Sequence, residues 1–373
     1  MSATESPTSR PPLDYVVHGA GGIGCVVAAR LASIGRSVGL IARGAHLEAL
    51  QANGLRVVGD TQAEVRLPAA GSVGELALGP DSLGPDSFGP DSLGPSTLGP
   101  STLGPSTVVR LTMKSNDTAA ALAASGDHYR DLAIFCLQNG VANEDTVAAR
   151  GLRAYGCRVL LGGRILEPGV VAHTGSGVLT VGCWPEGIDE VCRSFSADVT
   201  ASGLEAPLSE HVQAAKWGKL LSNVNNAYLA LTNTSIQAAR KFEKHRLFQA
   251  DVQEEALRVL YAAGIAVDAG RTSTIEEQIA KLRRPGDWEH VRIPTDPDKL
   301  GWPSTWQDLN FQRGQVEVEF FNGEVVRLAE RLGLKAPLND VLWHRCEDAA
   351  QRRLLPGSET TESLRAATEG DRE

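Results

Sequence analysis

The chain has 373 residues, a formal net charge of -9 and a sequence pI near 5.5. One hydrophobic core seldom supports that length, so we expect two domains. The composition, with 42% apolar and 22% charged residues, is that of a globular protein. A chain with this charge lacks the basic surplus that a general nucleic-acid or anionic-membrane binder needs, so we expect neither partner.

The polar segments near both ends are predicted to be flexible tails. Residues 1–12 are rich in proline and serine and lack the apolar centre of a secretory signal, and residues 356–373 are also polar. No apolar run reaches the roughly 18 residues that a membrane-spanning helix needs. The six cysteines show no C-x-x-C spacing, so we expect reduced thiols, no metal site and a cytoplasmic location.

The first ordered elements are those of a βαβ unit. The pattern predicts a strand over 14–18, a glycine turn over 19–24, a helix over 25–34 and a second strand over 37–42. Short apolar runs that alternate with alanine-rich helical stretches follow, at 108–113, 133–137 and 159–161. We therefore expect an N-terminal α/β domain over residues 13–210, a Rossmann-type, doubly wound, mainly parallel sheet.

Six pentads in tandem occupy residues 78–107, three of the form Leu/Phe-Gly-Pro-Asp-Ser and three of Leu-Gly-Pro-Ser-Thr. Proline and glycine at every fifth position are poorly tolerated inside a helix or a sheet. We interpret the segment as a loop inserted in a surface connection, because the cost of loop closure grows only logarithmically with length. A repetitive loop that binds a ligand or partner is the alternative.

Long helical periodicity begins near His211 and predicts an all-α C-terminal domain over residues 211–355, which we expect to carry catalysis and substrate binding. The predicted helices lie near 211–231, 237–264, 273–283, 304–333 and 338–354.

The glycine turn fits the G-x-G-x-x-G pattern, which favours a dinucleotide site when a strand precedes it and a helix follows. Gly19 permits the turn, Gly21 lets a pyrophosphate approach the backbone, and Gly24 lets the helix pack on the strand. Gly22 and Ile23 belong to the helix N-terminus that faces the anion.

Arg43 follows the second strand, where an NAD enzyme would place an acidic residue for the ribose hydroxyls. A guanidinium offers a fork of donors to the 2′-phosphate of NADP, so the sequence favours NADP. The alternative is a solvated residue at the end of a strand.

Lys216, Lys219, Asn223 and Asn226 follow an i, i+3, i+7, i+10 spacing, which predicts one polar stripe on the helix from His211. Such a stripe is often a solvated face. Asparagine is a poor helix former, however, and its repeated use on this stripe favours a functional surface.

With these motifs in view, the sequence resembles the ketopantoate reductase family over nearly all of the chain outside the pentads and the two tails. The resemblance is carried by Gly19–Gly24 with Arg43, by Leu111–Lys114, by Leu137–Val141, by Lys216–Asn223, by Ser304–Asp308 and by Glu317–Gly323. It implies a reductase that transfers hydride from NADPH to a 2-oxo acid, such as 2-dehydropantoate in pantothenate biosynthesis.

Carried over by position, the resemblance makes Lys219 the general acid that protonates the ketone oxygen. Asn139 and Asn223 are implied to orient cofactor or substrate, and Lys114 to lie near the nicotinamide. A lysine suits this role because hydride transfer creates alkoxide charge on oxygen.

The same resemblance implies that Ser304, Glu317 and Asn226 bind the substrate. Ala227 occupies the position where the family commonly has a second asparagine, and Asn226 is one residue earlier. The substrate is therefore either 2-dehydropantoate or a related ketone, bound as a small molecule, and we consider a homodimer as the assembly. An NADP(H)-binding sensor without turnover and a dehydrogenase of another secondary alcohol are the alternatives.

Overall fold

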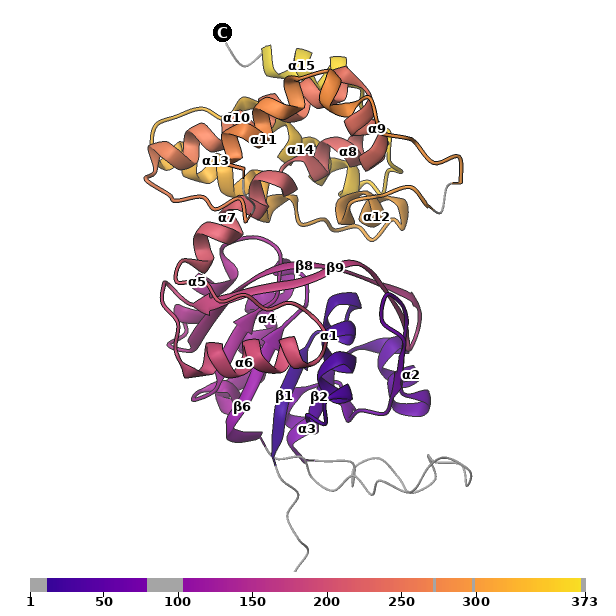
Figure 1. Ribbon diagram of the computed structural model, residues 1–373, viewed down its shortest axis with the longest axis vertical. Coiled ribbons are helices and arrows are strands. Elements are labelled where there is room, and N and C mark those ends of the chain that lie inside the picture. The colour runs from indigo at the N-terminus through magenta and orange to yellow at the C-terminus, as the bar shows by residue number, and fades with distance from the viewer. Residues whose placement is uncertain (1–11, 79–102, 271–272, 297–298, 370–373) are drawn as a thin grey trace, which may run out of the picture. The chain divides into compact units, whose positions relative to one another are not determined.

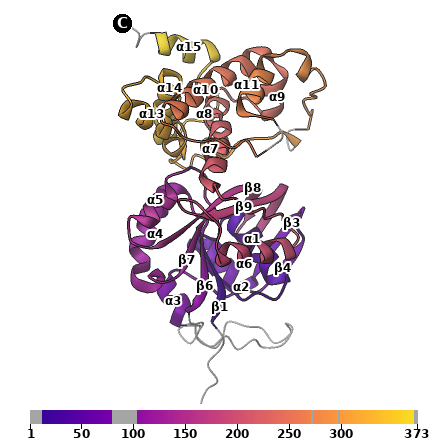
Figure 2. The same cartoon turned by 60° about the vertical axis from the view of Figure 1, so that its left-hand side comes forward.

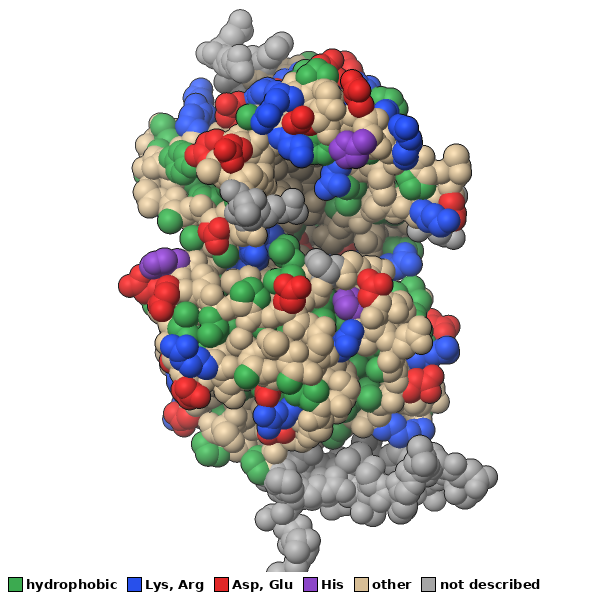
Figure 3. Space-filling view, viewed as in Figure 1, with side chains coloured by type: hydrophobic (Ala, Val, Ile, Leu, Met, Phe, Trp, Pro, Cys, Tyr) green, Lys and Arg blue, Asp and Glu red, His purple; other side chains and the backbone are tan. Residues whose placement is uncertain are grey.

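The computed structural model describes most of the chain as two compact units, with the boundary between Gln213 and Ala214 (Figure 1). The described residues are 12–78, 103–270, 273–296 and 299–369. No helix among them combines the length and the apolar character that crossing a membrane requires. On the face drawn in Figure 3, acidic and basic side chains are interspersed in both units.

Nine described strands of the first unit form one sheet in the order β4-β3-β9-β8-β7-β6-β1-β2-β5. They are β1 (Leu13–His18), β2 (Val38–Ile41), β3 (Leu55–Gly59), β4 (Ala63–Val65), β5 (Ala69–Ala70), β6 (Leu103–Leu111), β7 (Ala133–Cys136), β8 (Arg153–Glu167) and β9 (Val170–Cys183). Along the part of the sheet that runs β5-β2-β1-β6-β7-β8, all neighbouring strands are parallel. The pairs β8–β9 and β3–β4 are antiparallel. The strand order reverses at β1, which has β2 on one side and β6 on the other. The carboxyl ends of β1 and β6 are therefore the switch point at which such sheets bind ligands.

Helices cover both faces of this sheet (Figure 2). They are α1 (Gly22–Ser33), α2 (Gly44–Asn53), α3 (Val73–Leu78), α4 (Thr118–Ser125), α5 (Asn143–Ala148) and α6 (Glu190–Ala201). Successive residues of a strand point to opposite faces: Val17 packs in one apolar cluster with Phe195 of α6, and Val16 packs in a second with Leu122 of α4 and Val147 of α5. The predicted doubly wound, mainly parallel sheet is confirmed, although α1 begins at Gly22 and not at Cys25.

The last pentad was wrongly predicted to be loop, because β6 begins at Leu103. Leu103 pairs with Leu13, the register then shifts, and Val108 pairs with Tyr15. Pro105 lies at this irregularity, where a missing N–H removes no regular ladder hydrogen bond. The other pentads lie outside the described residues, apart from Leu78 at the end of α3.

The described part of the second unit is helical, which confirms the all-α C-terminal domain. Its helices are α7 (Val212–Asn223, which starts two residues before the unit boundary), α8 (Asn225–Leu231), α9 (Ile236–Lys241), α10 (Glu243–Ala262), α11 (Ile275–Arg283), α12 (Ser304–Asn310), α13 (Asn322–Arg331), α14 (Pro337–Gln351) and α15 (Thr361–Glu369), with 3-10 turns η4 (Gly286–Trp288) and η6 (Val318–Phe320).

Three predicted helices are each divided. The predicted helix 211–231 breaks at Val224, and the helix 237–264 breaks at Phe242, whose φ of -94° and ψ of 128° are extended. The predicted helix 304–333 is interrupted after α12, where Gln312 and Gly314 adopt positive φ angles of 47° and 75°. Continuous apolar periodicity does not reveal such local breaks.

The prediction of a flexible tail over 356–373 is also wrong for the described residues, since α15 packs on the helical unit. The hydroxyl groups of Tyr228 and Thr361 form a buried hydrogen bond of 2.8 Å. Arg365 of α15 forms an ion pair of 2.7 Å with Asp251 of α10. These contacts give the short helix the tertiary support that a segment of its length lacks alone.

Candidate functional site

The glycine turn lies at the carboxyl end of β1. Gly19 has a φ of +98°, which favours glycine, and a Cβ there would lie 2.5 Å from the backbone N of Met113. A Cβ at Gly24 would lie 2.5 Å from Thr112 Oγ1. These two glycines therefore let the turn and the start of α1 approach the segment that follows β6.

The N-terminus of α1 offers backbone donors to an anion. Helix α1 begins at Gly22, and its N-cap residue Gly21 supplies no side-chain cap. The N–H groups of Gly22, Ile23 and Gly24 have no intrahelical acceptor, as in the first turn of any α-helix. A Cβ at Gly21 would meet only Gly19 O, at 3.9 Å. The backbone is therefore open to a phosphate where the motif requires it.

Gly22 has a different role from Gly21. A Cβ at Gly22 would lie 2.2 Å from the carbonyl carbon of Gly163 in β8, and a Cβ at Gly163 would lie 2.4 Å from Gly22 C. Two glycines thus let α1 and β8 touch backbone to backbone. The sequence motif places Gly22 in the turn but gives no sign of Gly163, because the contact joins segments far apart in the chain.

Arg43 follows β2 as the N-cap residue of α2, beside the glycine turn. Its side chain is 80% exposed and forms an ion pair of 2.8 Å with Asp117. Burial, together with the nearby charge of Arg43, lowers the pKa of His18 to about 4, so the imidazole at the end of β1 is neutral near pH 7. The arrangement puts an exposed cation near the carboxyl ends of β1 and β2.

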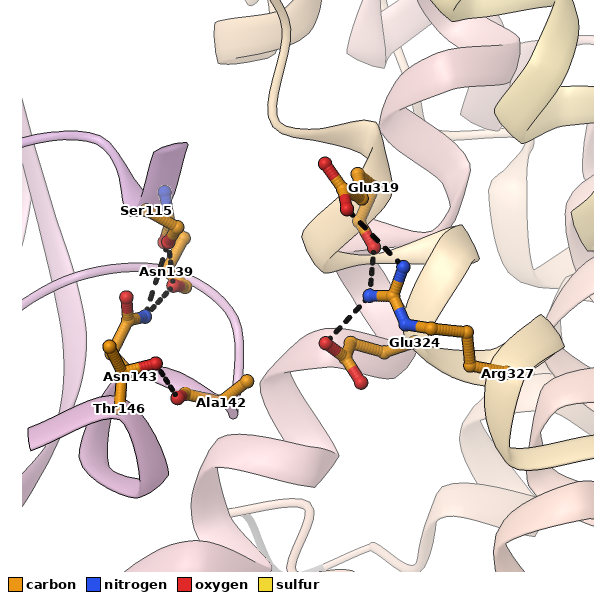
Figure 4. A network of polar contacts seen from close by, with 8 residues as sticks. All are labelled: Ser115, Asn139, Ala142, Asn143, Thr146, Glu319, Glu324 and Arg327. Atoms are coloured by element: carbon orange, nitrogen blue, oxygen red, sulfur yellow. Dashed lines mark hydrogen bonds and ion pairs between the residues drawn. The ribbon is translucent and has the colours of Figure 1, made fainter. Parts of the chain in front are cut away.

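A hydrogen-bond network joins the segments that follow β6 and β7 (Figure 4). The Ser115 hydroxyl donates to the Asn139 carbonyl at 2.9 Å, and the Asn143 amide donates to the same carbonyl at 2.8 Å and to Ser115 Oγ at 3.1 Å. Lys114 immediately precedes Ser115. The network therefore positions the backbone that carries Lys114 and Asn139, and sequence reasoning missed Ser115 and Asn143 as its members.

All of the predicted cofactor residues of the first unit lie at one edge of the sheet. The glycine turn, Arg43, Lys114 and Asn139 follow four neighbouring parallel strands, β1, β2, β6 and β7 respectively. This is the edge at which the switch point lies.

The predicted stripe of the helical unit is not continuous. Lys216, Lys219 and Asn223 lie on α7, where Lys219 and Asn223 are four residues apart and share a face. Asn226 lies beyond the break at Val224, on α8. The spacing that predicted a single stripe therefore holds for the first three residues only.

A buried polar network lies at the break between α7 and α8. The side-chain amide of Asn322 donates to the Val224 carbonyl and to Asn339 Oδ1, both at 3.0 Å. The Asn339 amide in turn donates to Glu255 Oε1 at 2.9 Å. Asn322 and Asn339 are fully buried, and burial raises the pKa of Glu255. The carbonyl at the break is thus satisfied by a side chain 98 residues away.

Gly218 lies between the two lysines of α7 and permits a close approach. A Cβ at this position would lie 1.9 Å from Asp268 O, and the N–H of Asp268 donates to the Ala214 carbonyl at 2.9 Å. The segment after α10 is thereby fixed on α7.

Ser304 and Glu317 lie on different elements of the helical unit. Ser304 is the first residue of α12, which packs against α8, and Glu317 is a buried residue directly before η6. Arg327 of α13 donates to the Glu319 carbonyl at 2.9 Å and to a Glu324 carboxylate oxygen at 2.8 Å (Figure 4). Arg327 thus ties η6 to α13 and thereby holds the turn next to Glu317.

Comparison with known families gives matches in both units. The model of the family "Ketopantoate reductase PanE/ApbA" matches residues 15–186, and the model of its C-terminal domain matches residues 211–348.

Individual proteins agree with that match. The 2-dehydropantoate 2-reductase of Pyrococcus horikoshii is 27% identical over 328 residues, which cover 88% of this chain and 94% of that protein. The crystal structure of a PanE/ApbA family ketopantoate reductase from Ralstonia eutropha has a TM-score of 0.69 and 26% identity, covering 91% of this chain and 99% of the other. A D-mandelate dehydrogenase in complex with NADH has the same fold, with a TM-score of 0.69, 19% identity and coverage of 91% and 99%.

Proposed function

The chain belongs to the ketopantoate reductase PanE/ApbA family and is therefore an oxidoreductase, and on that premise we propose that it reduces a 2-oxo acid with NADPH. The observation that carries the proposal is the gathering of the glycine turn, Arg43, Lys114 and Asn139 at the switch-point edge of the first unit. Family membership supports the reduction of a 2-oxo acid, and the site residues support the finer assignments below.

The first unit fits a dinucleotide. The first-turn N–H groups of α1 are donors to a pyrophosphate, and Gly21 leaves space for it. The exposed guanidinium of Arg43 suits a 2′-phosphate, provided that its ion pair with Asp117 exchanges for the stronger pairing with phosphate. Lys114 and Asn139 orient the nicotinamide end. When bound, NADPH supplies the hydride.

The second unit provides the proton. Reduction of a ketone develops negative charge on its oxygen, and the Lys219 ammonium stabilises this charge and donates the proton. Asn223, on the same face of α7, orients the reacting group. Ser304, Asn226 and Glu317 bind the remainder of the substrate, with Ser304 directed to the carboxylate and Glu317 to a hydroxyl or to the lysine.

The preferred substrate is 2-dehydropantoate or a 2-oxo acid related to it. Several relatives bear the name 2-dehydropantoate 2-reductase, which supports the first choice. A homodimer, a cytoplasmic location and a role in pantothenate biosynthesis remain predictions of the same proposal.

The test is whether the purified protein oxidises NADPH in the presence of a 2-oxo acid. The loss of nicotinamide absorbance is measured with each member of a panel of 2-oxo acids, beginning with 2-dehydropantoate. We expect turnover of at least one acid, and binding of NADPH at least about tenfold tighter than that of NADH. Tight NADPH binding without turnover of any acid would favour a sensor. Equal affinity for the two cofactors would remove the role of Arg43.

A further inference from the structure

Two cysteines and an aspartate meet in the first unit, in a cluster that the proposed reduction does not use. Cys183 ends β9, Asp189 is the N-cap residue of α6, and Cys192 lies in the first turn of that helix. The two sulfur atoms are 3.7 Å apart, and one oxygen of Asp189 lies with them in a group whose ligand atoms are all within 4.8 Å of one another. The group could not be predicted from the sequence, because its C-x5-D-x2-C spacing is not that of a common zinc motif.

The distance between the sulfur atoms suits a shared metal ion. Zinc binds thiolate at about 2.3 Å in tetrahedral geometry, so two sulfur ligands of one ion are about 3.8 Å apart. A disulfide would need a separation of about 2.05 Å. Cys183 Sγ and Cys192 Sγ form a thiol–thiol hydrogen bond of 3.7 Å, so without a metal the two sulfur atoms already lie at a separation close to the first value and far from the second.

Neighbouring groups hold the carboxylate in place. Asp189 Oδ1 accepts the backbone N–H of Cys192 at 2.9 Å, and Oδ2 accepts the Tyr155 hydroxyl at 2.7 Å. Each carboxylate oxygen has a second lone pair, so one of them can still bind an ion. Hydrogen bonds of this kind orient metal ligands. The guanidinium of Arg153, 4.0 Å from Asp189 Oδ2, offsets part of the negative charge of the Asp189 carboxylate.

The cluster is also accessible from one side. Cys192 is fully buried, Cys183 is half-buried, and the Asp189 side chain is 40% exposed. An ion held by the three residues would therefore have two sulfur ligands on the protein side and a position open to water beside the carboxylate.

We propose that Cys183, Asp189 and Cys192 form a binding site for a thiophilic divalent cation of the zinc class, with water as the fourth ligand. Binding replaces two S–H bonds by two metal–sulfur bonds and releases two protons, without any change of oxidation state. The ion joins the end of β9 to the start of α6 and stabilises the first unit. This proposal departs from the expectation, drawn from cysteine spacing, that the chain binds no metal.

The experiment is titration of the reduced, chelator-free, full-length protein with Co²⁺, followed by displacement with Zn²⁺. Thiolate coordination predicts a sulfur-to-cobalt charge-transfer absorption that saturates at one ion per chain and disappears when Zn²⁺ is added. Cys183→Ser and Cys192→Ser should each lose most of this absorption. Asp189→Asn keeps an N-cap residue but removes the charge, and should weaken binding by about tenfold or more. Cys346→Ser, in the helical unit, is the matched control and should bind cobalt as the unchanged chain does.

A measurement on the unchanged chain covers the case in which a variant fails to fold. Saturating Zn²⁺ should slow alkylation of Cys183 by iodoacetamide at least about tenfold, as read by peptide mass spectrometry, because a coordinated thiolate is no longer free to react. The proposal is overturned if the reduced protein shows no charge-transfer band at millimolar Co²⁺, or if the band survives in both cysteine variants. It is equally overturned if saturating Zn²⁺ leaves the rate of alkylation of Cys183 in the reduced protein unchanged.

Discussion

The two units place their proposed site residues by different means. In the first unit, the residues follow the ends of adjacent parallel strands, and backbone groups and glycines form much of the site. In the helical unit, Lys219 and Asn223 are side chains on α7, and the buried amide of Asn322, distant in sequence, donates to the Val224 carbonyl directly after that helix. The first kind of site follows from a local motif, whereas the second depends on long-range packing. Variants in each unit should therefore fail in different ways.

The largest effect is expected at Lys219. Lys219→Ala should lower kcat by about 10² to 10⁴-fold, equivalent to roughly 3 to 5 kcal/mol of transition-state stabilisation, because the general acid is lost. NADPH binding, measured by fluorescence titration, should be unchanged because the phosphate contacts are proposed to lie in the first unit.

Lys216→Ala is the matched control for this variant, one turn away on the same helix. It should retain much more activity than Lys219→Ala. If Lys216→Ala were the more damaging change, the acid would have been assigned to the wrong lysine.

In the first unit, two adjacent glycines should separate folding from binding. Gly22→Ala forces a Cβ against the backbone of Gly163 and should reduce the free energy of unfolding by about 3 kcal/mol. Gly21→Ala has open space, so it should fold normally and lose NADPH affinity because the methyl group occupies the phosphate position. Thermal unfolding and cofactor titration measure the two effects. Equal loss of stability in both variants would contradict the distinction.

The polar network of the helical unit should have a somewhat smaller effect. Asn322→Ala leaves the Val224 carbonyl and Asn339 Oδ1 without their donor and should reduce the free energy of unfolding by about 2 kcal/mol. It should also lower kcat with little effect on NADPH binding, because α7 and α8 are no longer held at their junction. Gln351→Ala, on an exposed position of α14, is the control. Unchanged urea denaturation of Asn322→Ala would show that the network does not stabilise the fold.

The smallest effect is expected in the pentads. Leu76 of α3 and Leu103 of β6 pack in the same apolar cluster, so a short connection can join the two elements. Deletion of residues 83–102 should therefore change the free energy of unfolding by about 1 kcal/mol and leave NADPH affinity unaltered. A large fall in the unfolding temperature, or lost cofactor binding, would show that the pentads do more than connect.

The sequence allowed the fold class to be predicted, because short apolar runs between helical stretches, and a glycine turn between a strand and a helix, are local signals. The glycine at position 24 packs as its motif requires.

What could not be predicted depends on contacts between distant segments. The Val224 carbonyl at the helix break accepts a hydrogen bond from Asn322, and α15 contacts Tyr228 and Asp251. None of these contacts is visible in the local pattern. The strand character of the last pentad depends on its pairing with Leu13. Composition and periodicity describe a segment alone, and these elements are stabilised by their neighbours.

The central claim is that the first unit binds the cofactor and the second supplies the proton. Its most direct test is to measure kcat at saturating NADPH, and the KM for NADPH, for four proteins: the unchanged chain, Arg43→Ala, Lys219→Ala and the double variant. The account predicts that Arg43→Ala raises the KM for NADPH about tenfold or more at nearly unchanged kcat, that Lys219→Ala lowers kcat at nearly unchanged KM, and that the double variant shows both effects independently. A fall in kcat for Arg43→Ala as large as that for Lys219→Ala, or normal turnover by Lys219→Ala, would contradict it.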